Sequence, residues 1–379
     1  MSCDFLSLAN PGVQKLHPYQ AGKPTDELER ELGISNIVKL ASNENPLGLS
    51  DSVKKVLQKE LAELTRYPDA NGYYLKKALA DKYAVNINQV TLGNGSNDLL
   101  ELVARAFVAR EHEVMFAEHA FVVYPIVTQA IGASAVVVPA KDYGHDLDAM
   151  AEAITAKTKL IFIANPNNPT GTFLEQEELK AFLEKVPAEV LVVLDEAYFE
   201  YASASRRGNA IAWISKFPNL IVSRTFSKGY GLAGLRVGYA ISHPEIADIL
   251  NRVRQPFNCN ALALKAAETV LKDTEYLQRS VALNNEGMTY LSHFFTEHHL
   301  EFIPSMGNFI TVNVGSAADS GASDIKSGDE VYQALLQEGV IVRPITGYGL
   351  PNHLRVSIGT MNENQRFVEA LSKVLNLGS

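Results

Sequence analysis

The stretch "SRTFSKGYGLAGLRVGY" (223–239) combines a lysine, hydroxyl groups and glycines, and these residue types could serve two kinds of chemistry. Its glycines, from Gly229 to Gly234, match the G-x-G-x-x-G pattern of a dinucleotide-binding loop. That pattern requires a full helix directly after the glycines. Here the strand-like "RVGYAIS" (236–242) follows at once and leaves no room for a helix. We therefore interpret the glycines as a tight backbone turn beside a reactive lysine, Lys228.

A possible phosphate-binding helix start is the second feature with chemical potential. "TLGNGSNDLLELVARAF" (91–107) places Gly95, Ser96 and Asn97 directly before a helical pattern. A glycine-rich turn at a helix N-terminus presents free N–H groups and the positive end of the helix dipole, which suit a phosphate. The same residues could serve as an ordinary helix cap. This segment alone leaves both interpretations open.

Two further segments put polar side chains where buried strands end. "ANPNNPTGT" (164–172) is a turn that contains Asn168, and "VVLDEAYFEY" (192–201) ends an apolar strand with Asp195 and Tyr198. The carboxyl ends of strands are where α/β folds hold ligand groups. Pyridoxal phosphate needs a lysine for its Schiff base, an acid opposite its pyridine nitrogen and a phosphate cradle. The combined set of residues therefore favours a pyridoxal-phosphate enzyme.

The elements that must position these groups alternate between apolar strands and helices. Continuous Val, Ile and Leu runs predict strands that are buried on both faces, as in a mostly parallel sheet. Charged periodic segments such as 175–186 predict helices between them. This alternation indicates an α/β fold. The predicted strands are 113–118, 134–140, 158–166, 189–197, 219–227 and 236–242.

The C-terminal third predicts a smaller α+β domain, joined to the first by a long helix over 259–298. "GSAADSGASDIKSGDE" (315–330) is rich in Gly, Ser and Asp and predicts an exposed loop. The further elements expected here are strands at 308–314, 340–345 and 353–359 and helices at 328–339 and 362–377. We expect an N-terminal arm at 1–45 that contributes to the small domain and covers the site. A large cofactor-binding domain at 46–270 and a small domain at 271–379 would follow.

Composition and charge exclude several classes of protein. The 379 residues include 34 basic and 43 acidic side chains, a formal net charge of −9. Without a basic tract, binding to nucleic acid or to an anionic membrane is not expected. Two cysteines, Cys3 and Cys259, form no C-x-x-C pair, which is typical of a reduced cytosolic protein. No apolar run reaches signal-peptide or membrane-spanning length. We expect a cytoplasmic protein without a metal site.

Three segments, "NPNNPTGT", "LDEAYFEY" and "SRTFSKGYGLAGLRVGY", resemble the fold-type I pyridoxal-phosphate aminotransferases, and the similarity extends along essentially the whole chain. Within that group, four segments resemble the histidinol-phosphate aminotransferases: "LHPYQAGKP" (16–24), "KLASNENPLG" (39–48), "RYPDANGYYLKKALA" (66–80) and "HLRVSIGTMNEN" (353–364). The resemblance implies a large domain with a mostly parallel sheet and a smaller α+β domain. It also implies transamination of L-histidinol phosphate with 2-oxoglutarate, giving imidazole acetol phosphate and L-glutamate, in histidine biosynthesis.

The resemblance further implies roles for individual residues. Lys228 would form the Schiff base and act as the acid and base of the proton shift, and Asp195 would pair with the pyridine nitrogen. Asn168 and Tyr198 would hydrogen-bond the ring's 3-oxygen, and Tyr124 would stack on the ring face. The residues expected around the cofactor phosphate are Gly95, Ser96, Asn97, Thr225, Ser227 and Arg236, with Tyr67 from the second subunit of a homodimer.

Substrate binding is assigned to two arginines and to the N-terminal arm. Arg343 and Arg355 lie on apolar strands, where an unpaired charge would be costly, so each is expected to have an anionic partner. The rigid fork of an arginine fits both carboxylate and phosphate. A structural salt bridge remains the alternative for both. The resemblance adds Tyr19 and Asn43, from an arm that folds back over the pocket.

Two related activities remain open at this level. An aminotransferase that acts mainly on phenylalanine and tyrosine is one, because an imidazole and a phenyl ring are both planar and similar in size. A phospho-amino-acid decarboxylase on the same scaffold would share the cofactor residues but release carbon dioxide. A non-catalytic regulator would usually carry a fused DNA-binding segment, and the sequence shows none.

Overall fold

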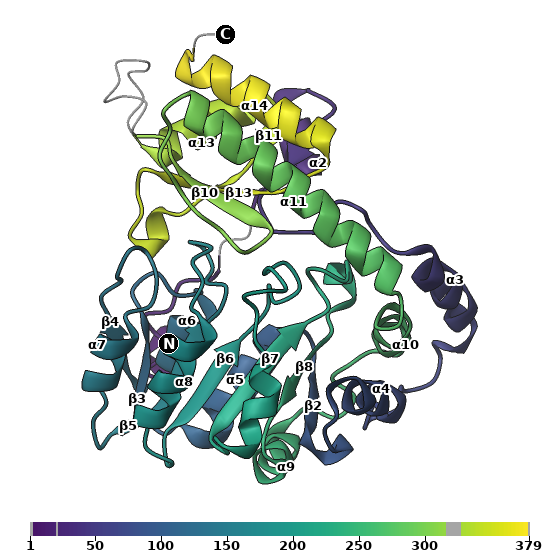
Figure 1. The fold of residues 1–379 in the computed structure, drawn as a ribbon, viewed down its shortest axis with the longest axis vertical. Helices are drawn as coiled ribbons and strands as arrows, with labels where there is room; N and C mark the ends of the chain where they lie inside the picture. Colours follow the sequence, from purple (N-terminus) through teal and green to yellow (C-terminus); the bar gives the residue numbers. More distant parts are fainter. Residues whose placement is uncertain (1–2, 20–21, 316–326, 378–379) are drawn as a thin grey trace.

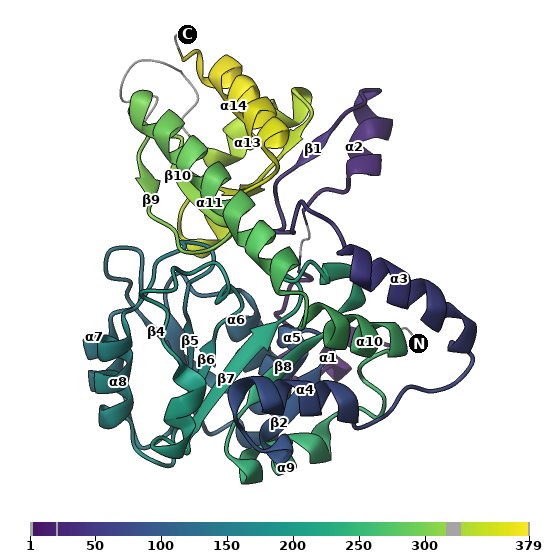
Figure 2. The same ribbon diagram turned by 45° about the vertical axis from the view of Figure 1, so that its right-hand side comes forward.

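The computed structural model describes residues 3–19, 22–315 and 327–377, and Figures 1 and 2 show it in two views. Most of the predicted exposed loop at 315–330 therefore lies outside the described residues. Within the described part of the chain, no helix is both long and apolar enough to cross a membrane.

The larger part of the molecule is built around a seven-stranded sheet with the order β2-β8-β7-β6-β5-β3-β4. Its strands are β2 (Val90–Gly93), β3 (Glu113–Ala117), β4 (Ser134–Val138), β5 (Thr158–Ala164), β6 (Leu191–Asp195), β7 (Leu220–Thr225) and β8 (Gly238–Ile241). Only β8 runs antiparallel to its neighbours, β2 and β7, and the other pairs are parallel. The predicted α/β class with a mostly parallel sheet is confirmed.

Helices cover both faces of this sheet (Figures 1 and 2). Side chains alternate along β5, so Ile161 and Ile163 face one apolar cluster while Leu160 and Phe162 face another. The first cluster is completed by α3 (Asp51–Glu60), α4 (Tyr73–Tyr83), α7 (Leu147–Glu152), α8 (Gln176–Lys185) and α10 (Ala261–Val270). The second is completed by α5 (Ser96–Phe107), α6 (Val123–Ile131) and α9 (Pro244–Val253).

The edge strand β4 departs from the expectation of burial on both faces. Its residues are mostly exposed, and Val137 is 51% exposed. The reason is its position, because β4 is the last strand of the sheet and, among the described strands, pairs with β3 alone. A run of valines in the sequence does not distinguish an edge strand from a central one.

A second, smaller layer packs above the carboxyl ends of the large sheet in Figure 1. It contains a four-stranded antiparallel sheet with the order β12-β13-β10-β9 and a two-stranded parallel pair, β1-β11. These strands are β1 (Val38–Lys39), β9 (Phe302–Ile303), β10 (Phe309–Asn313), β11 (Val340–Ile341), β12 (Arg343–Pro344) and β13 (His353–Ser357). The accompanying helices are α2 (Thr25–Leu32), α11 (Thr274–Glu297), α13 (Gly328–Gln337) and α14 (Met361–Leu375), and a short α1 (Phe5–Leu8) lies near the N-terminus.

The long helix predicted over 259–298 is in fact two helices, α10 and α11. The Asp273 side chain accepts a hydrogen bond from the Tyr276 N–H and so starts α11 afresh. The N-terminal segment joins the smaller layer through β1, which pairs with β11. The proposed division of the chain at residues 45 and 270 stays a prediction.

Candidate active site

A cavity of about 210 Å³ lies where β5, β6 and β7 end, beneath the smaller sheet. Its walls include Ala164, Asp195 and Thr225, the last residues of those three strands, and Arg355 of β13. The cavity brings together thirteen of the predicted site residues: Tyr19, Asn43, Ser96, Asn97, Asn168, Asp195, Tyr198, Thr225, Ser227, Lys228, Arg236, Arg343 and Arg355. The other three, Gly95, Tyr124 and Tyr67, do not line it.

Lys228 follows the end of β7 and extends its amine toward the N-terminal segment. Its Nζ donates a hydrogen bond to the Ser42 carbonyl at 3.0 Å. Burial lowers the pKa of Lys228 to about 7, and the nearby charge of Arg355 acts in the same direction. A large fraction of the amine is therefore neutral and nucleophilic near neutral pH. Ser42, whose contribution is a backbone oxygen, is a site residue that side-chain chemistry could not indicate.

Asp195 is the last residue of β6 and is almost fully buried. Its Oδ2 accepts a hydrogen bond from the Tyr124 hydroxyl at 2.9 Å. Its buried Oδ1 has no hydrogen bond of standard geometry within the described residues, although the Ala197 N–H lies close enough to the carboxylate to lower its pKa. Burial raises the pKa of Asp195 to about 6. A buried carboxylate oxygen without a partner is well suited to a protonated ring nitrogen, because an ionised acid in this environment needs a cationic or N–H partner. The observed Asp195 therefore fits the pyridine nitrogen of pyridoxal phosphate.

Tyr124, which we expected to stack on the cofactor ring, does not line the cavity. Tyr124 is fully buried and stacks on Phe162 of β5, with ring centroids 4.5 Å apart and an interplanar angle of 4°. Phe121, three residues earlier, lines the cavity instead. Tyr124 lies in the first turn of α6, on the face that packs against the sheet. Its hydroxyl therefore reaches Asp195 from the protein core and not from the cavity. Phe121 is thus the aromatic residue of this segment that lines the cavity, and the sequence places it near Tyr124 without indicating which of them does so.

A buried hydrogen-bond network joins the predicted amide, phenol and guanidinium groups. The Tyr198 hydroxyl accepts from Asn43 Nδ2 at 2.9 Å and from Asn168 Nδ2 at 3.1 Å. Arg355 donates from Nη1 to Asn168 Oδ1 at 2.6 Å and from Nη2 to the Ala41 carbonyl at 2.7 Å. Both amide groups thus donate to the Tyr198 hydroxyl oxygen. This shared acceptor holds Tyr198 and Asn168 at the same part of the cavity.

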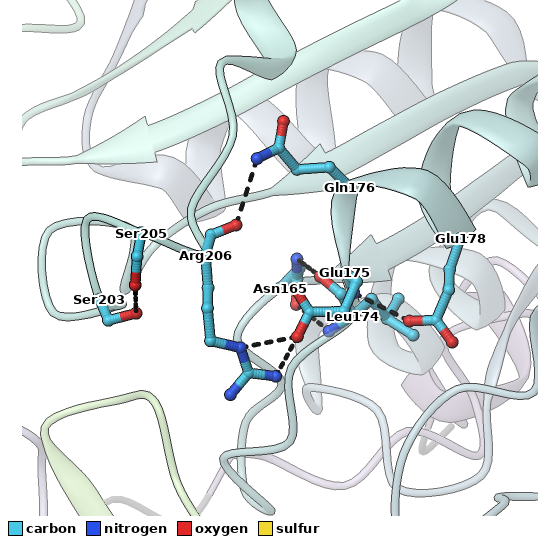
Figure 3. Close-up of polar contacts among 8 residues, drawn as sticks. All are labelled: Asn165, Leu174, Glu175, Gln176, Glu178, Ser203, Ser205 and Arg206. Carbon is cyan, nitrogen blue, oxygen red and sulfur yellow. Dashed lines mark hydrogen bonds and ion pairs between the residues drawn. The ribbon is translucent and has the colours of Figure 1, made fainter.

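The turn that carries Asn168 is closed at its base by a pair of hydrogen bonds (Figure 3). Asn165 accepts from the Leu174 N–H at 2.8 Å and donates to the Leu174 carbonyl at 3.0 Å. Immediately after, Glu175 caps α8, and Arg206 donates to its carboxylate from Nε at 2.6 Å. Asn165 and Leu174 are therefore held together at the two ends of the turn, and this restricts the position of Asn168 between them.

An anion site forms where α5 begins. Ser96 and Asn97, its first residues, line the cavity, and the exposed N–H groups of a helix start favour a negatively charged ligand. Arg236 donates from Nη1 to the Ser227 hydroxyl at 3.1 Å and lines the same wall. Gly95 packs against this guanidinium from outside the cavity, because a Cβ at Gly95 would lie 2.2 Å from Arg236 Nη2. The guanidinium, the hydroxyls and the helix start together fit a phosphate monoester.

The wall of the cavity opposite the α5 start carries two further predicted cationic residues, Arg343 and Arg355. Arg355 is buried, and burial lowers its pKa, with the Tyr198 and Tyr348 side chains acting in the opposite direction. The Arg343 guanidinium stacks over the Tyr19 ring at 5.5 Å. Tyr348, which sequence analysis did not identify, also lines this wall. Two guanidinium groups and several aromatic side chains therefore face one space, as recognition of an anionic substrate with a planar ring requires.

Tyr67 lies away from the cavity of its own chain. The residue is 83% exposed, and its ring stacks on Phe257 with ring centroids 4.6 Å apart. Phe257 is itself 41% exposed and has a positive φ of 57°. The predicted contact of Tyr67 with the cofactor phosphate of a second subunit stays a prediction.

Sequence comparisons identify related proteins over almost the full length. The sequence model "Aminotransferase class I and II" matches residues 35–371. "Histidinol-phosphate aminotransferase 1" of Idiomarina loihiensis is 62% identical over 369 residues, which cover 97% of this chain and 98% of the relative. "Histidinol-phosphate aminotransferase 2" of Pasteurella multocida is 57% identical over 373 residues, covering 98% of this chain and 100% of the relative.

Solved structures with the same fold include histidinol-phosphate aminotransferase from Sinorhizobium meliloti in complex with pyridoxal-5'-phosphate. That structure has a TM-score of 0.87 and 28% sequence identity, with 97% of each chain covered. A double mutant of Thermus thermophilus aspartate aminotransferase has a TM-score of 0.82 at 21% identity, covering 97% of this chain and 99% of that one, and shows similarity of fold only.

Proposed function

The chain belongs to the class I and II aminotransferases, among the histidinol-phosphate aminotransferases, and we propose that it transfers the amino group of L-histidinol phosphate to 2-oxoglutarate with pyridoxal phosphate as cofactor. The observation that carries this proposal is one cavity that holds four complementary groups. They are the low-pKa amine of Lys228, the unpartnered Oδ1 of Asp195, an anion site at Arg236 and a second cationic wall at Arg355.

Each residue has a distinct task in this proposal. Bound pyridoxal phosphate supplies an electron-poor ring that stabilises negative charge at the substrate's Cα. Lys228 would hold the cofactor through Nζ and, once freed by the substrate amine, would take the proton from the substrate's Cα. Asp195 would keep a proton on the pyridine nitrogen, and Tyr198 and Asn168 would bind the ring's 3-oxygen. Phe121 would limit movement of the ring by packing on its face.

The direct test is an amino-donor comparison with the purified, cofactor-loaded enzyme. L-histidinol phosphate, phenylalanine and tyrosine are each supplied with 2-oxoglutarate, and glutamate formation is measured. We expect the highest kcat/KM for L-histidinol phosphate. A higher kcat/KM for phenylalanine or tyrosine would assign the enzyme to aromatic amino acids instead, which the aromatic lining of Tyr19, Phe121 and Tyr348 also suits. Release of carbon dioxide from a phospho-amino acid, without glutamate formation, would indicate the decarboxylase alternative.

The two substrate-facing arginines are expected to differ in selectivity. A dianionic phosphate gains more from a second guanidinium than a singly charged carboxylate does. Arg355→Ala should therefore impair reaction with every amino donor, whereas Arg343→Ala should weaken L-histidinol phosphate more than phenylalanine, by about 1–3 kcal/mol for one lost charge-assisted bond. Single half-reactions measured by the absorbance change of the bound cofactor check this, because glutamate is then absent.

Arg343→Lys is the matched control, since it keeps the positive charge but loses the planar fork. A partial recovery of selectivity in Arg343→Lys would agree with a phosphate contact. Equal losses for both donors in Arg343→Ala would contradict the selectivity claim and leave Arg343 in a structural role.

The proposed working unit is a homodimer with shared active sites, in which Tyr67 of one subunit reaches the cofactor phosphate of the other. Lys228→Ala and Tyr67→Phe proteins are each expected to be impaired alone. Heterodimers of the two contain one site with both defects and one site with neither, so an equal mixture should regain about a quarter of the wild-type sites. Activity is measured before and after subunit exchange. No recovery despite exchange shown by differently tagged subunits would mean that Lys228 and Tyr67 do not act across the interface.

A further inference from the structure

Three hydrogen bonds between described residues join the smaller sheet and its β9–β10 loop to the Asn168 turn, and Arg355 alone of the three donors is a predicted site residue. Arg355 donates from Nη1 to Asn168 Oδ1 at 2.6 Å, and the Met306 N–H donates to the Gly171 carbonyl at 2.9 Å. Between them, the Thr311 hydroxyl donates to the Pro169 carbonyl at 2.6 Å. Thr311 is completely buried, so solvent does not compete for this bond.

Thr311 and Arg355 are placed together by strand register. They are directly paired across the antiparallel strands β10 and β13, and paired residues in such strands project from the same face of the sheet. The same pair of strands therefore carries the neutral hydroxyl that contacts Pro169 and the guanidinium that contacts Asn168. The strand pairing sets the relative positions of the two Cα atoms from which these side chains extend.

Substrate binding affects the Arg355–Asn168 contact and the Thr311–Pro169 contact differently. In this structure both terminal nitrogens of Arg355 are used by protein acceptors, Asn168 Oδ1 and the Ala41 carbonyl. These two bonds leave other N–H groups of the guanidinium for a substrate anion, including the buried Nε–H, and an anion bound there competes with the two protein acceptors for the same positive charge. The Thr311 hydroxyl is uncharged and donates to the backbone carbonyl of Pro169, so a substrate anion does not compete for this hydrogen bond.

We propose that Thr311 is a positioning residue, which holds the Pro169 carbonyl and thereby the Asn168 amide in place while Arg355 engages the substrate. This inference rests on the proposed function, because it assigns Asn168 to the cofactor's 3-oxygen. The Asn168 Nδ2 also donates to the Tyr198 hydroxyl, so a displaced turn would disturb both donors at that oxygen.

The test compares Thr311→Val, which keeps the shape but removes the donor, with Thr311→Ser, which keeps the donor. In the holoenzyme, Thr311→Val should lower kcat about 10-fold, since small displacements of reacting groups have large kinetic effects. KM for L-histidinol phosphate should change less than about twofold, because Arg355 is intact. Thr311→Ser should remain close to wild type in both constants.

A second readout needs no substrate. The absorbance of the lysine-bound cofactor is titrated with pH, and Thr311→Val should raise the midpoint by about half a pH unit, as expected for a weakened hydrogen bond to the ring oxygen. A merely structural role would lower the unfolding temperature without moving this midpoint. If Thr311→Val does not fold, Thr311→Ala removes the same donor without adding a methyl group against the carbonyl.

Several results would overturn the proposal. They are an unchanged kcat and titration midpoint in Thr311→Val, equal defects in the Val and Ser variants, or a raised KM with unchanged kcat. Failure of the proposed function is distinguishable, because wild-type enzyme would then not use L-histidinol phosphate. The titration difference between the Val and Ser variants would still report on Thr311 in that case.

Discussion

Replacing Lys228 with alanine is expected to lower the transamination rate by at least about 10⁴-fold, the largest effect of any single substitution in this protein. The variant loses the group that would bond the cofactor and also the base that would take the proton from the substrate's Cα. Burial lowers the pKa of the wild-type amine to about 7, so its neutral form predominates above neutral pH. The rate of cofactor incorporation into the apoprotein should therefore rise with pH, with a midpoint near 7.

Lys228→Arg is the matched control, because a guanidinium keeps the positive charge but does not deprotonate in this pH range. It should be as inactive as Lys228→Ala. Borohydride reduction of the cofactor-loaded wild type, followed by peptide mapping, should place the cofactor on Lys228. A label on a different lysine would refute the assignment, as would substantial turnover in either variant.

Asp195→Ala is expected to have the second largest effect, a loss of about 10²–10³ in kcat together with weaker cofactor binding. The reason is that the buried Oδ1, for which the described part of the chain supplies no hydrogen bond of standard geometry, is the acceptor that we assign to the pyridine nitrogen. Asp195→Asn tests the charge at nearly constant shape and should be similarly impaired. Kinetics and cofactor titration measure both consequences, and near-normal turnover in Asp195→Asn would give the carboxylate another role.

Asp195 also predicts a pH dependence of the cofactor-free protein. Burial raises its pKa from 3.8 to about 6, which costs the ionised form about 3 kcal/mol. A raised carboxyl pKa contributes stability that is complete below pH 3.8 and is lost as the pH rises through 6. The apoprotein should therefore lose more stability between pH 4 and pH 7 than the Asp195→Asn apoprotein does. Urea unfolding at the two pH values measures this difference, and parallel behaviour of the two proteins would contradict it.

The chemistry of the site was accessible from the sequence because its main groups lie at strand ends. Asp195 ends a wholly apolar run, Asn168 lies in an Asn-Pro turn after another, and Lys228 follows a third. Parallel strands bring their carboxyl ends to one edge of a sheet, so residues in these local contexts are expected to converge. The same apolar runs predicted the α/β class. Residue type and local pattern therefore determined which chemistry the chain can perform.

Only the tertiary structure decided which of two nearby side chains faces the cavity. Phe121 and Tyr124 are both aromatic and three residues apart, yet Phe121 lines the cavity and Tyr124 is buried against Phe162. That choice depends on how α6 and the residues directly before it pack against the sheet. The exposure of Val137 depends in the same way on β4 being the edge strand.

Contacts across long sequence separations were likewise decided by the fold alone. The Ser42 carbonyl that accepts from Lys228 and the Thr311 hydroxyl that holds Pro169 are more than 100 residues from their partners. Backbone carbonyls occur at every position, and a threonine in a strand is chemically ordinary, so neither carries a local signal. The sequence by itself determined the reactive groups and the class of fold that gathers them. The positioning groups became visible only when packing of the two sheets set the distances between them.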